Sequence, residues 1–135
     1  MSPTWSSDLE TGDEAIDKDH REIIERINLF QTAYHQGMGE EQIEPLVQYL
    51  ESYIDRHFTA EEELMTSHNY PGLREHRELH MEFRQKFSDL MEQLRSEGPG
   101  VKLATTAYFL MEQWLWVHIA TLDKKMADFV MGRQN

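Results

Sequence analysis

The chain contains no cysteine among its 135 residues. This absence excludes disulfide bonds, zinc sites with thiolate ligands and iron–sulfur clusters. It is compatible with a reducing compartment. The first residues are polar and acidic and lack the basic and apolar regions of a signal peptide. We therefore predict a cytoplasmic protein.

Positive charge and long apolar runs are also scarce. Lysine and arginine number 13 against 25 aspartates and glutamates, so the formal net charge is −12. An acidic surface disfavours nucleic acid and anionic membrane surfaces as partners. No stretch approaches the roughly 20 apolar residues of a membrane span. The sequence therefore predicts contact with neither nucleic acid nor membrane.

What the chain does contain is helical periodicity. Apolar residues recur at intervals of three and four, interrupted by the turn sequences "GMGEE" at 37–41, "NYPG" at 69–72 and "EGPG" at 97–100. We expect one domain over 1–135, with an extended arm at 1–16, helices at about 17–36, 41–67, 73–96 and 101–122, and a tail at 123–135 that holds a short helix. Four amphipathic helices joined by short turns predict an all-α fold, an up-down-up-down antiparallel four-helix bundle.

Five histidines and two carboxylates follow one another in a regular order: His20, His57-x3-Glu61, His76-x3-His80 and His118-x4-Asp123. Residues four apart share a helix face, and the antiparallel topology brings these segments to one end of the bundle. A lone histidine on an apolar face is more often a hydrogen-bonded core residue than a ligand. So many buried polar groups at one end would need partners, and a metal ion would satisfy them together. Imidazole suits iron, copper, zinc and nickel, and carboxylates favour iron or manganese.

Asp123 does not fit this pattern on a straight helix. It lies five residues after His118, which rotates it about 500°, or about 140° away from the face of that histidine. Either the helix ends or loosens near 120–122, or Asp123 is a solvated acid. Outside the pattern, His35 and His68 are expected at the surface, and Glu62 and Glu63 are expected to face away from the site.

Four segments resemble the bacterial hemerythrin family: "AIDKDH" at 15–20, "HFTAEEELM" at 57–65, "YPGLREHRELHMEF" at 70–83 and "WLWVHIATLD" at 114–123. Single HxxxE or HxxxH motifs are common, but all of them in this order form a specific pattern that extends through most of the chain. The chain departs from the family at Asp19, where glutamine commonly precedes the first histidine. This departure removes no ligand.

The resemblance implies a centre of two iron ions. His76, His80 and His118 would bind one ion and His20 and His57 the other, with Glu61, Asp123 and a solvent-derived oxygen as bridges. One position would stay open for dioxygen. Because they flank the ligands in sequence, we also expect four residues to form a small apolar pocket above the metals: Phe58, Trp114, Leu115 and Ile119.

The implied function is reversible binding of dioxygen for carriage, storage or supply, without catalytic residues. The sequence identifies no protein that receives the oxygen. Three alternatives stay open: a di-iron enzyme acting on peroxide or nitric oxide, an oxygen or redox sensor acting through a partner, and a structural or zinc-binding bundle.

Overall fold

The computed structural model describes residues 3–133. Its elements are η1 (Ser7–Leu9), α1 (Glu14–His35), α2 (Gly39–Ser67), α3 (Leu73–Glu97), α4 (Val101–Phe109), η2 (Leu110–Trp116), η3 (Ile119–Asp123) and α5 (Lys124–Val130). The element η1 is a 3-10 turn, whereas η2 and η3 are π-helical. No strand occurs between residues 3 and 133.

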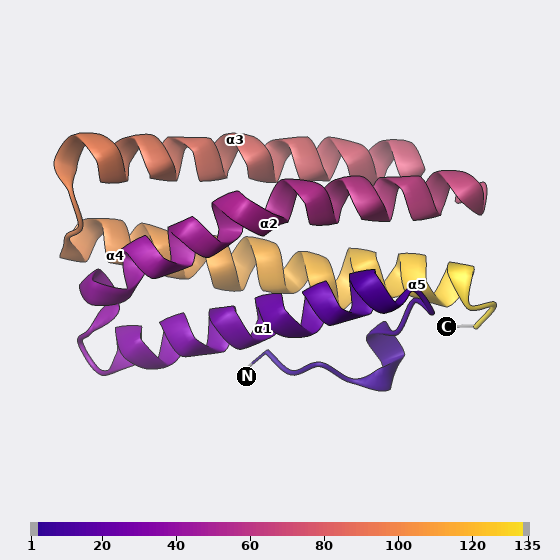
Figure 1. The fold of residues 1–135 in the computed structure, drawn as a ribbon, viewed down its shortest axis with the longest axis horizontal. Helices are drawn as coiled ribbons and strands as arrows, with labels where there is room; N and C mark the ends of the chain where they lie inside the picture. Colours follow the sequence, from indigo (N-terminus) through magenta and orange to yellow (C-terminus); the bar gives the residue numbers. More distant parts are fainter. Residues whose placement is uncertain (1–2, 134–135) are drawn as a thin grey trace.

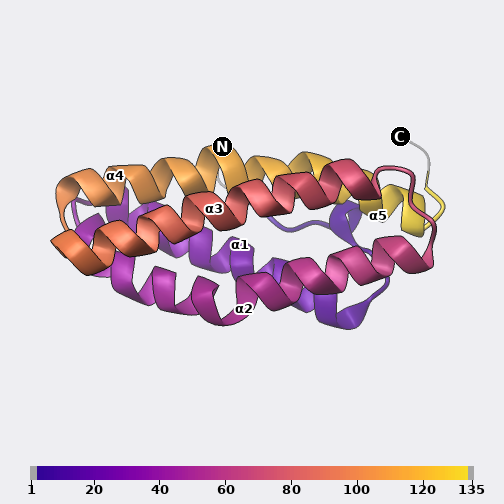
Figure 2. The same ribbon diagram turned by 90° about the horizontal axis from the view of Figure 1, so that it is seen from above.

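The helices form an antiparallel bundle (Figures 1 and 2). The fourth helix of the bundle consists of four successive segments, α4, η2, η3 and α5. It lies beside α1, α2 and α3. The predicted all-α four-helix bundle is therefore confirmed. Within the described part of the chain, no helix has the length and apolar character needed to cross a membrane.

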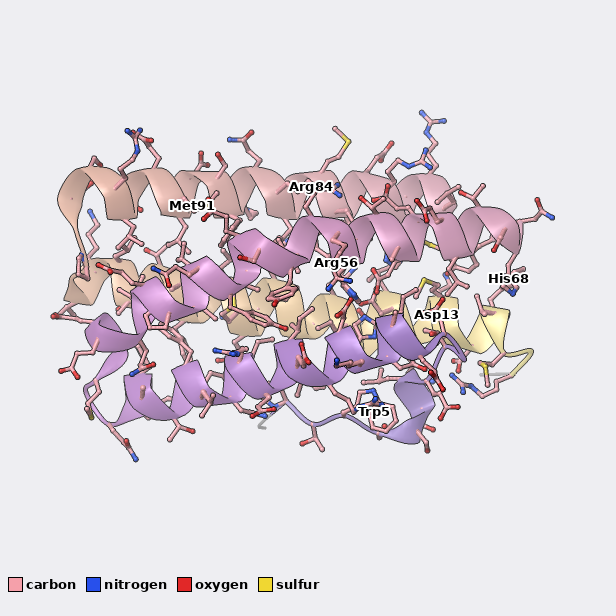
Figure 3. All side chains as sticks on the ribbon, viewed as in Figure 1. Trp5, Asp13, Arg56, His68, Arg84 and Met91 are labelled. Carbon is pink, nitrogen blue, oxygen red and sulfur yellow. The ribbon has the colours of Figure 1, made fainter. Side chains whose placement is uncertain are left out.

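Local signals explain where the helices begin and end. Asp13, labelled in Figure 3, accepts a hydrogen bond from the backbone N–H of Ile16 at 3.1 Å and so caps α1. The helix consequently begins at Glu14 rather than near 17. Gly37 and Gly98 follow α1 and α3 with φ of +78° and +75°, which glycine adopts without steric cost.

Two expected boundaries differ from the structure. The arm includes the 3-10 turn η1, so it is not extended throughout. The fourth helix was expected to end near 122, but the π-helical η3 continues directly into α5. Of the arm at 1–16 and the tail at 123–135, residues 1, 2, 134 and 135 lie outside the described residues.

Apolar side chains fill the bundle on both sides of one polar layer. Along α2, Ile54 and Phe58 belong to the main core, the buried Glu61 follows, and Met65 belongs to a second, smaller cluster. The smaller cluster is completed by Tyr70 and Met126. The polar layer therefore lies between two apolar regions, which separate it from solvent along the bundle axis.

Candidate metal centre

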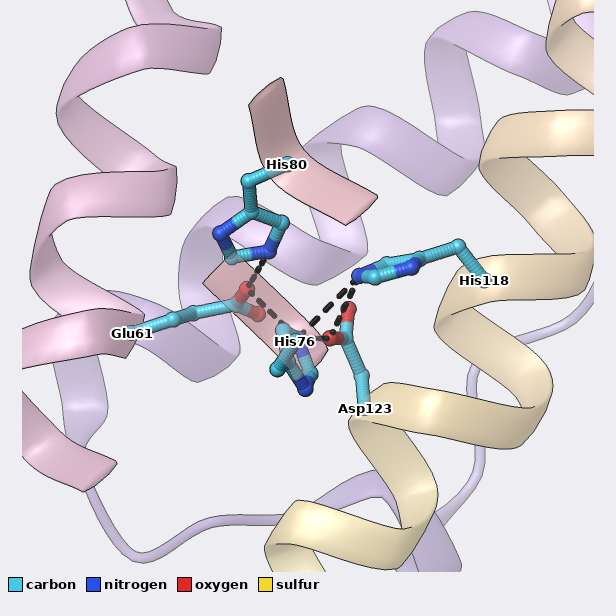
Figure 4. A group of neighbouring side chains, drawn as sticks. All are labelled: Glu61, His76, His80, His118 and Asp123. Atoms are coloured by element: carbon cyan, nitrogen blue, oxygen red, sulfur yellow. Dashed lines mark hydrogen bonds and ion pairs between the residues drawn. The ribbon is translucent and has the colours of Figure 1, made fainter. Parts of the chain in front are cut away.

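The structure brings all seven candidate ligands together in the polar layer, and each of these residues is at most 4% exposed. Their ligand atoms form two groups, and within each group all atoms lie within 4.8 Å of one another. The three-histidine group contains Glu61, His76, His80, His118 and Asp123 (Figure 4). The two-histidine group contains His20, His57, Glu61 and Asp123. The two carboxylates belong to both groups.

Glu61 presents one oxygen atom to each group. Its Oε2 lies 2.7 Å from Nε2 of His20 and 3.1 Å from Nε2 of His57. Its Oε1 lies 3.1 Å from Nε2 of His80 and 3.8 Å from Nε2 of His76. This is the arrangement of a carboxylate that can bridge two ions.

Asp123 divides its oxygen atoms in the same way. Its Oδ2 lies 3.0 Å from Nε2 of His20. Its Oδ1 lies 3.0 Å from Nε2 of His76 and 3.2 Å from Nε2 of His118. Glu61 and Asp123 therefore have equivalent positions between the two groups.

The π-helix η3 explains how Asp123 reaches the site. The backbone N–H of Lys124 bonds to the carbonyl oxygen of Ile119, five residues earlier. Where hydrogen bonds join residues i and i+5, side chains five apart share a face. His118 and Asp123 consequently point the same way, and Asp123 is only 2% exposed. Of the alternatives that the sequence left open, the structure therefore shows the loosened helix, and Asp123 is not a solvated acid.

Unpaired polar atoms point to a cation between the two carboxylates. Among the buried atoms without a hydrogen-bond partner are four ligand atoms that face one another in the layer: Nε2 of His57, Nε2 of His80, Oε1 of Glu61 and Oδ1 of Asp123. A buried polar atom without a partner costs about 1–3 kcal/mol. Metal ions would satisfy these atoms together, and the mixture of imidazole nitrogen and carboxylate oxygen suits iron. The residues present therefore fit metal ions.

The two carboxylates dominate the electrostatics of the layer. Burial lowers the pKa of His20, but hydrogen bonds to Asp123 and Glu61 and their charges outweigh it and raise this pKa to about 10. The pKa of His76 is raised to about 10 by the same opposing effects. Burial raises the pKa of Glu61 and of Asp123, but the facing imidazoles hold both pKa values well below their usual range. The layer therefore attracts cations, whether protons or metal ions.

We expect the free energy of unfolding of the metal-free protein to fall between pH 6.5 and 10. His20 and His76 have pKa values near 10 when folded, against 6.5 in the unfolded chain. Their contribution is complete below pH 6.5 and is lost as the pH rises through 10. Metal affinity should instead rise as the pH rises, because metal ions must displace the protons from the histidines.

Denaturant unfolding at a series of pH values measures this fall. The variant His68→Gln is the control, since it removes an exposed histidine outside the layer and should reproduce the fall. Constant stability of the metal-free protein between pH 6.5 and 10 would contradict the electrostatic account.

Two carboxylates behind the ligands were not identified from the sequence. Asp19 is buried, and its Oδ2 lies 3.3 Å from Nδ1 of His57. Oε2 of Glu62 lies 2.8 Å from Nδ1 of His80, so the expectation that Glu62 faces away is wrong. Glu63 is exposed, as expected. A histidine that ligates through Nε2 usually donates its other N–H to an acceptor. This rule predicts an acceptor beside each ligand histidine, and a search for one could have identified both acids.

Two of the four predicted pocket residues stack on ligand rings, and the other two are buried in the main core. Phe58 stacks on His80, with ring centroids 3.8 Å apart and an interplanar angle of 5°. Trp114 stacks on His118 at 4.9 Å and 12°. Leu115 and Ile119 are buried in the adjoining core. The side of the layer that faces the main core is therefore apolar.

Comparisons with known proteins agree with this geometry. A family model described as "Hemerythrin HHE cation binding domain" matches residues 11–130. Bacteriohemerythrin of Pseudomonas paraeruginosa (strain DSM 24068 / PA7) is 32% identical over 126 residues, which cover 93% of this chain and 80% of that protein. Bacteriohemerythrin of Stenotrophomonas maltophilia (strain R551-3) is 32% identical over 134 residues, which cover 97% and 83%.

A more distant relative is bacteriohemerythrin of Campylobacter jejuni subsp. jejuni serotype O:23/36 (strain 81-176), 24% identical over 122 residues that cover 90% of each chain. No solved structure gives a significant match. The residues matched by the family model extend past both ends of the polar layer in sequence, from before His20 to after Asp123.

Proposed function

This chain belongs to the hemerythrin family, and on that basis we propose that it binds dioxygen reversibly at a centre of two iron ions. The family is one of cation-binding domains. The proposal of two ions, rather than one, rests on how both carboxylates divide their oxygen atoms between the two groups. Glu61 and Asp123 each present one oxygen atom to the two-histidine group and the other to the three-histidine group.

The residues of the layer have separate roles in this proposal. His76, His80 and His118 hold one ion, His20 and His57 hold the other, and Glu61 and Asp123 lie between them. When bound, two ferrous ions would supply the electrons with which dioxygen is taken up. The two-histidine group offers one imidazole fewer than the other group. We therefore assign the open position for dioxygen to the ion held by His20 and His57.

The apolar side of the layer would exclude water and larger solutes. Phe58 and Trp114 cover the faces of His80 and His118, and Leu115 and Ile119 are buried in the main core. A small neutral molecule such as dioxygen suits this enclosure better than a polar substrate. This favours binding, for carriage, storage or supply, over catalysis.

The decisive test is metal analysis combined with an absorption spectrum. Protein loaded anaerobically with ferrous iron should hold two irons per chain, and its spectrum should change on exposure to oxygen and revert when oxygen is removed. One tightly bound ion per chain, or a preference for zinc, would contradict the proposed centre. Turnover of peroxide or nitric oxide without reversible oxygen uptake would instead indicate an enzyme.

A pair of variants tests the pocket separately from the general packing of the core. Leu115 lies three residues before His118, and Met111 lies a further turn away from it. Both side chains are fully buried, so each truncation to alanine should cost about 2–5 kcal/mol. A cavity at Leu115 would also admit water and protons, which promote oxidation of ferrous to ferric iron.

We therefore expect the ferrous protein to be oxidised in air several times faster in Leu115→Ala than in Met111→Ala. The measurement is the rise of the ferric absorption spectrum with time in the two variants and the unaltered protein. Equal rates in both variants would show that Leu115 serves the packing of the core alone.

A further inference from the structure

We propose that Asp19 and Glu62 are positioning residues, each of which serves one of the two metal positions. The proposal rests on the two-ion centre described above and adds to it. Asp19 acts through His57 on the two-histidine position, and Glu62 acts through His80 on the three-histidine position. Neither carboxylate belongs to the two ligand groups.

Glu62 fixes the ring of His80. Nδ1 of His80 donates to Oε2 of Glu62 at 2.8 Å, and the face of the same ring stacks on Phe58. The ring is therefore held by its edge and by its face, with Nε2 directed to Oε1 of Glu61. Arg77 and Arg84 approach Glu62 to within 3.5 and 3.8 Å from the surface, and its side chain is only 17% exposed.

Asp19 holds His57 in an equivalent way. Nδ1 of His57 donates to Oδ2 of Asp19 at 3.3 Å, while Nη2 of Arg56 donates to Oδ1 at 3.2 Å. Figure 3 labels Arg56 and Arg84, the outer members of the two arrangements, on α2 and α3. Each arrangement thus runs from a guanidinium near the surface through a carboxylate to an imidazole of the centre.

A carboxylate at Nδ1 determines which imidazole nitrogen can bind metal. A neutral imidazole carries one N–H, and a carboxylate can only accept, so the hydrogen stays on Nδ1 and Nε2 keeps its lone pair. Two other ligand histidines have no carboxylate at Nδ1. Nδ1 of His20 and Nδ1 of His76 are buried without a hydrogen-bond partner. Each group therefore contains one histidine fixed by a carboxylate, His57 or His80, and one whose Nδ1 is unpaired, His20 or His76.

The carboxylates also add negative charge next to the centre. A carboxylate that accepts from a ligating histidine makes that imidazole a stronger donor to the metal. Removing it should loosen the metal at that position and make the ferric state less favourable. Because Asp19 and Glu62 act on different groups, each substitution should affect one iron first.

The experiment compares Glu62→Gln and Glu62→Met with Asp19→Asn and Asp19→Leu. The amides keep a hydrogen-bond acceptor without its charge, and the apolar residues remove both. Glu63→Gln is the matched control, because it removes one acidic charge from an exposed neighbour of Glu62. The proteins are loaded with ferrous iron, and two quantities are measured: the release of iron to a ferrous chelator over time, and the midpoint potential of the iron.

Removal of the acceptor should accelerate release of one of the two irons about 10- to 100-fold. The iron that is released faster should be the one at the three-histidine position in the Glu62 variants and the one at the two-histidine position in the Asp19 variants. The midpoint potential of the iron should rise. In both measurements, the amide variants should lie between the unaltered protein and the apolar variants. Glu63→Gln should match the unaltered protein. These results would support separate positioning roles.

Unchanged release and potential in all four variants, with only a lower melting temperature, would overturn the proposal and leave both acids with a structural role. Equal acceleration of both irons by either substitution would overturn the assignment of one carboxylate to each position. Failure of the unaltered protein to hold two irons would instead contradict the proposed function.

Discussion

Glu61→Gln should release iron from both metal positions, more than about 100-fold faster than the unaltered protein, since loss of a supporting residue alone costs about 10- to 100-fold in metal affinity. The amide has nearly the same shape as the carboxylate but has no charge. Glu61 is the residue whose oxygen atoms approach His20 and His57 on one side and His80 on the other. Its replacement therefore weakens both positions at once, whereas a histidine substitution weakens one.

The measurement is iron content after gel filtration, followed by the rate of iron release to a chelator. Glu63→Gln is the appropriate control because Glu63 is exposed two residues further along α2. Glu62→Gln is not a neutral control, because Glu62 accepts a hydrogen bond from His80. Retention of both irons by Glu61→Gln would show that this carboxylate does not bridge them.

The sequence predicted the bundle and the gathering of the seven residues because both follow from simple geometry. Apolar spacing of three and four residues specifies amphipathic helices, and short turns make successive helices antiparallel. In that topology, ligands early in α1 and α3 meet ligands late in α2. His20, His57 and His76 accordingly lie in one layer, and no knowledge of side-chain contacts was needed to expect this.

The sequence could not predict the path of the backbone near Asp123. A π-helix is defined by hydrogen bonds between residues five apart, and no local sequence signal such as proline marks η3. The contacts that accompany it come from distant segments, since Asp123 reaches His20 of α1 and His76 of α3. The fold of this segment therefore depends on tertiary contacts, which sequence periodicity does not contain.

The supporting carboxylates were missed for a related reason. Helical periodicity placed Glu62 on a polar face of α2, which is ordinarily a solvated face. Between α2 and α3, however, Glu62 meets His80, Arg77 and Arg84. Asp19 similarly meets His57 and Arg56 of α2 from its place on α1. Such contacts depend on the distance between helices, which the sequence alone does not give.

Asp123→Asn should release iron from both positions, as expected for Glu61→Gln, and should alter the absorption spectrum of the iron that remains. Asp123 reaches the two-histidine group through Oδ2 and the three-histidine group through Oδ1. An amide cannot offer a charged oxygen to each group, because one of its two terminal atoms is a nitrogen that donates. The loss should therefore be larger than any loss caused by Asp19→Asn.

Asp128→Asn provides the matched control for this substitution. Asp128 is also a buried aspartate, 4% exposed, and it lies five residues further along the chain, in α5. Its carboxylate pairs with Lys124 at 2.9 Å and with Arg133 at 3.1 Å, outside the metal centre. Asp128→Asn should lower the melting temperature and leave the iron content unchanged. If Asp123→Asn also keeps both irons and an unaltered spectrum, Asp123 is a buried partner of the histidines and not a bridge between ions.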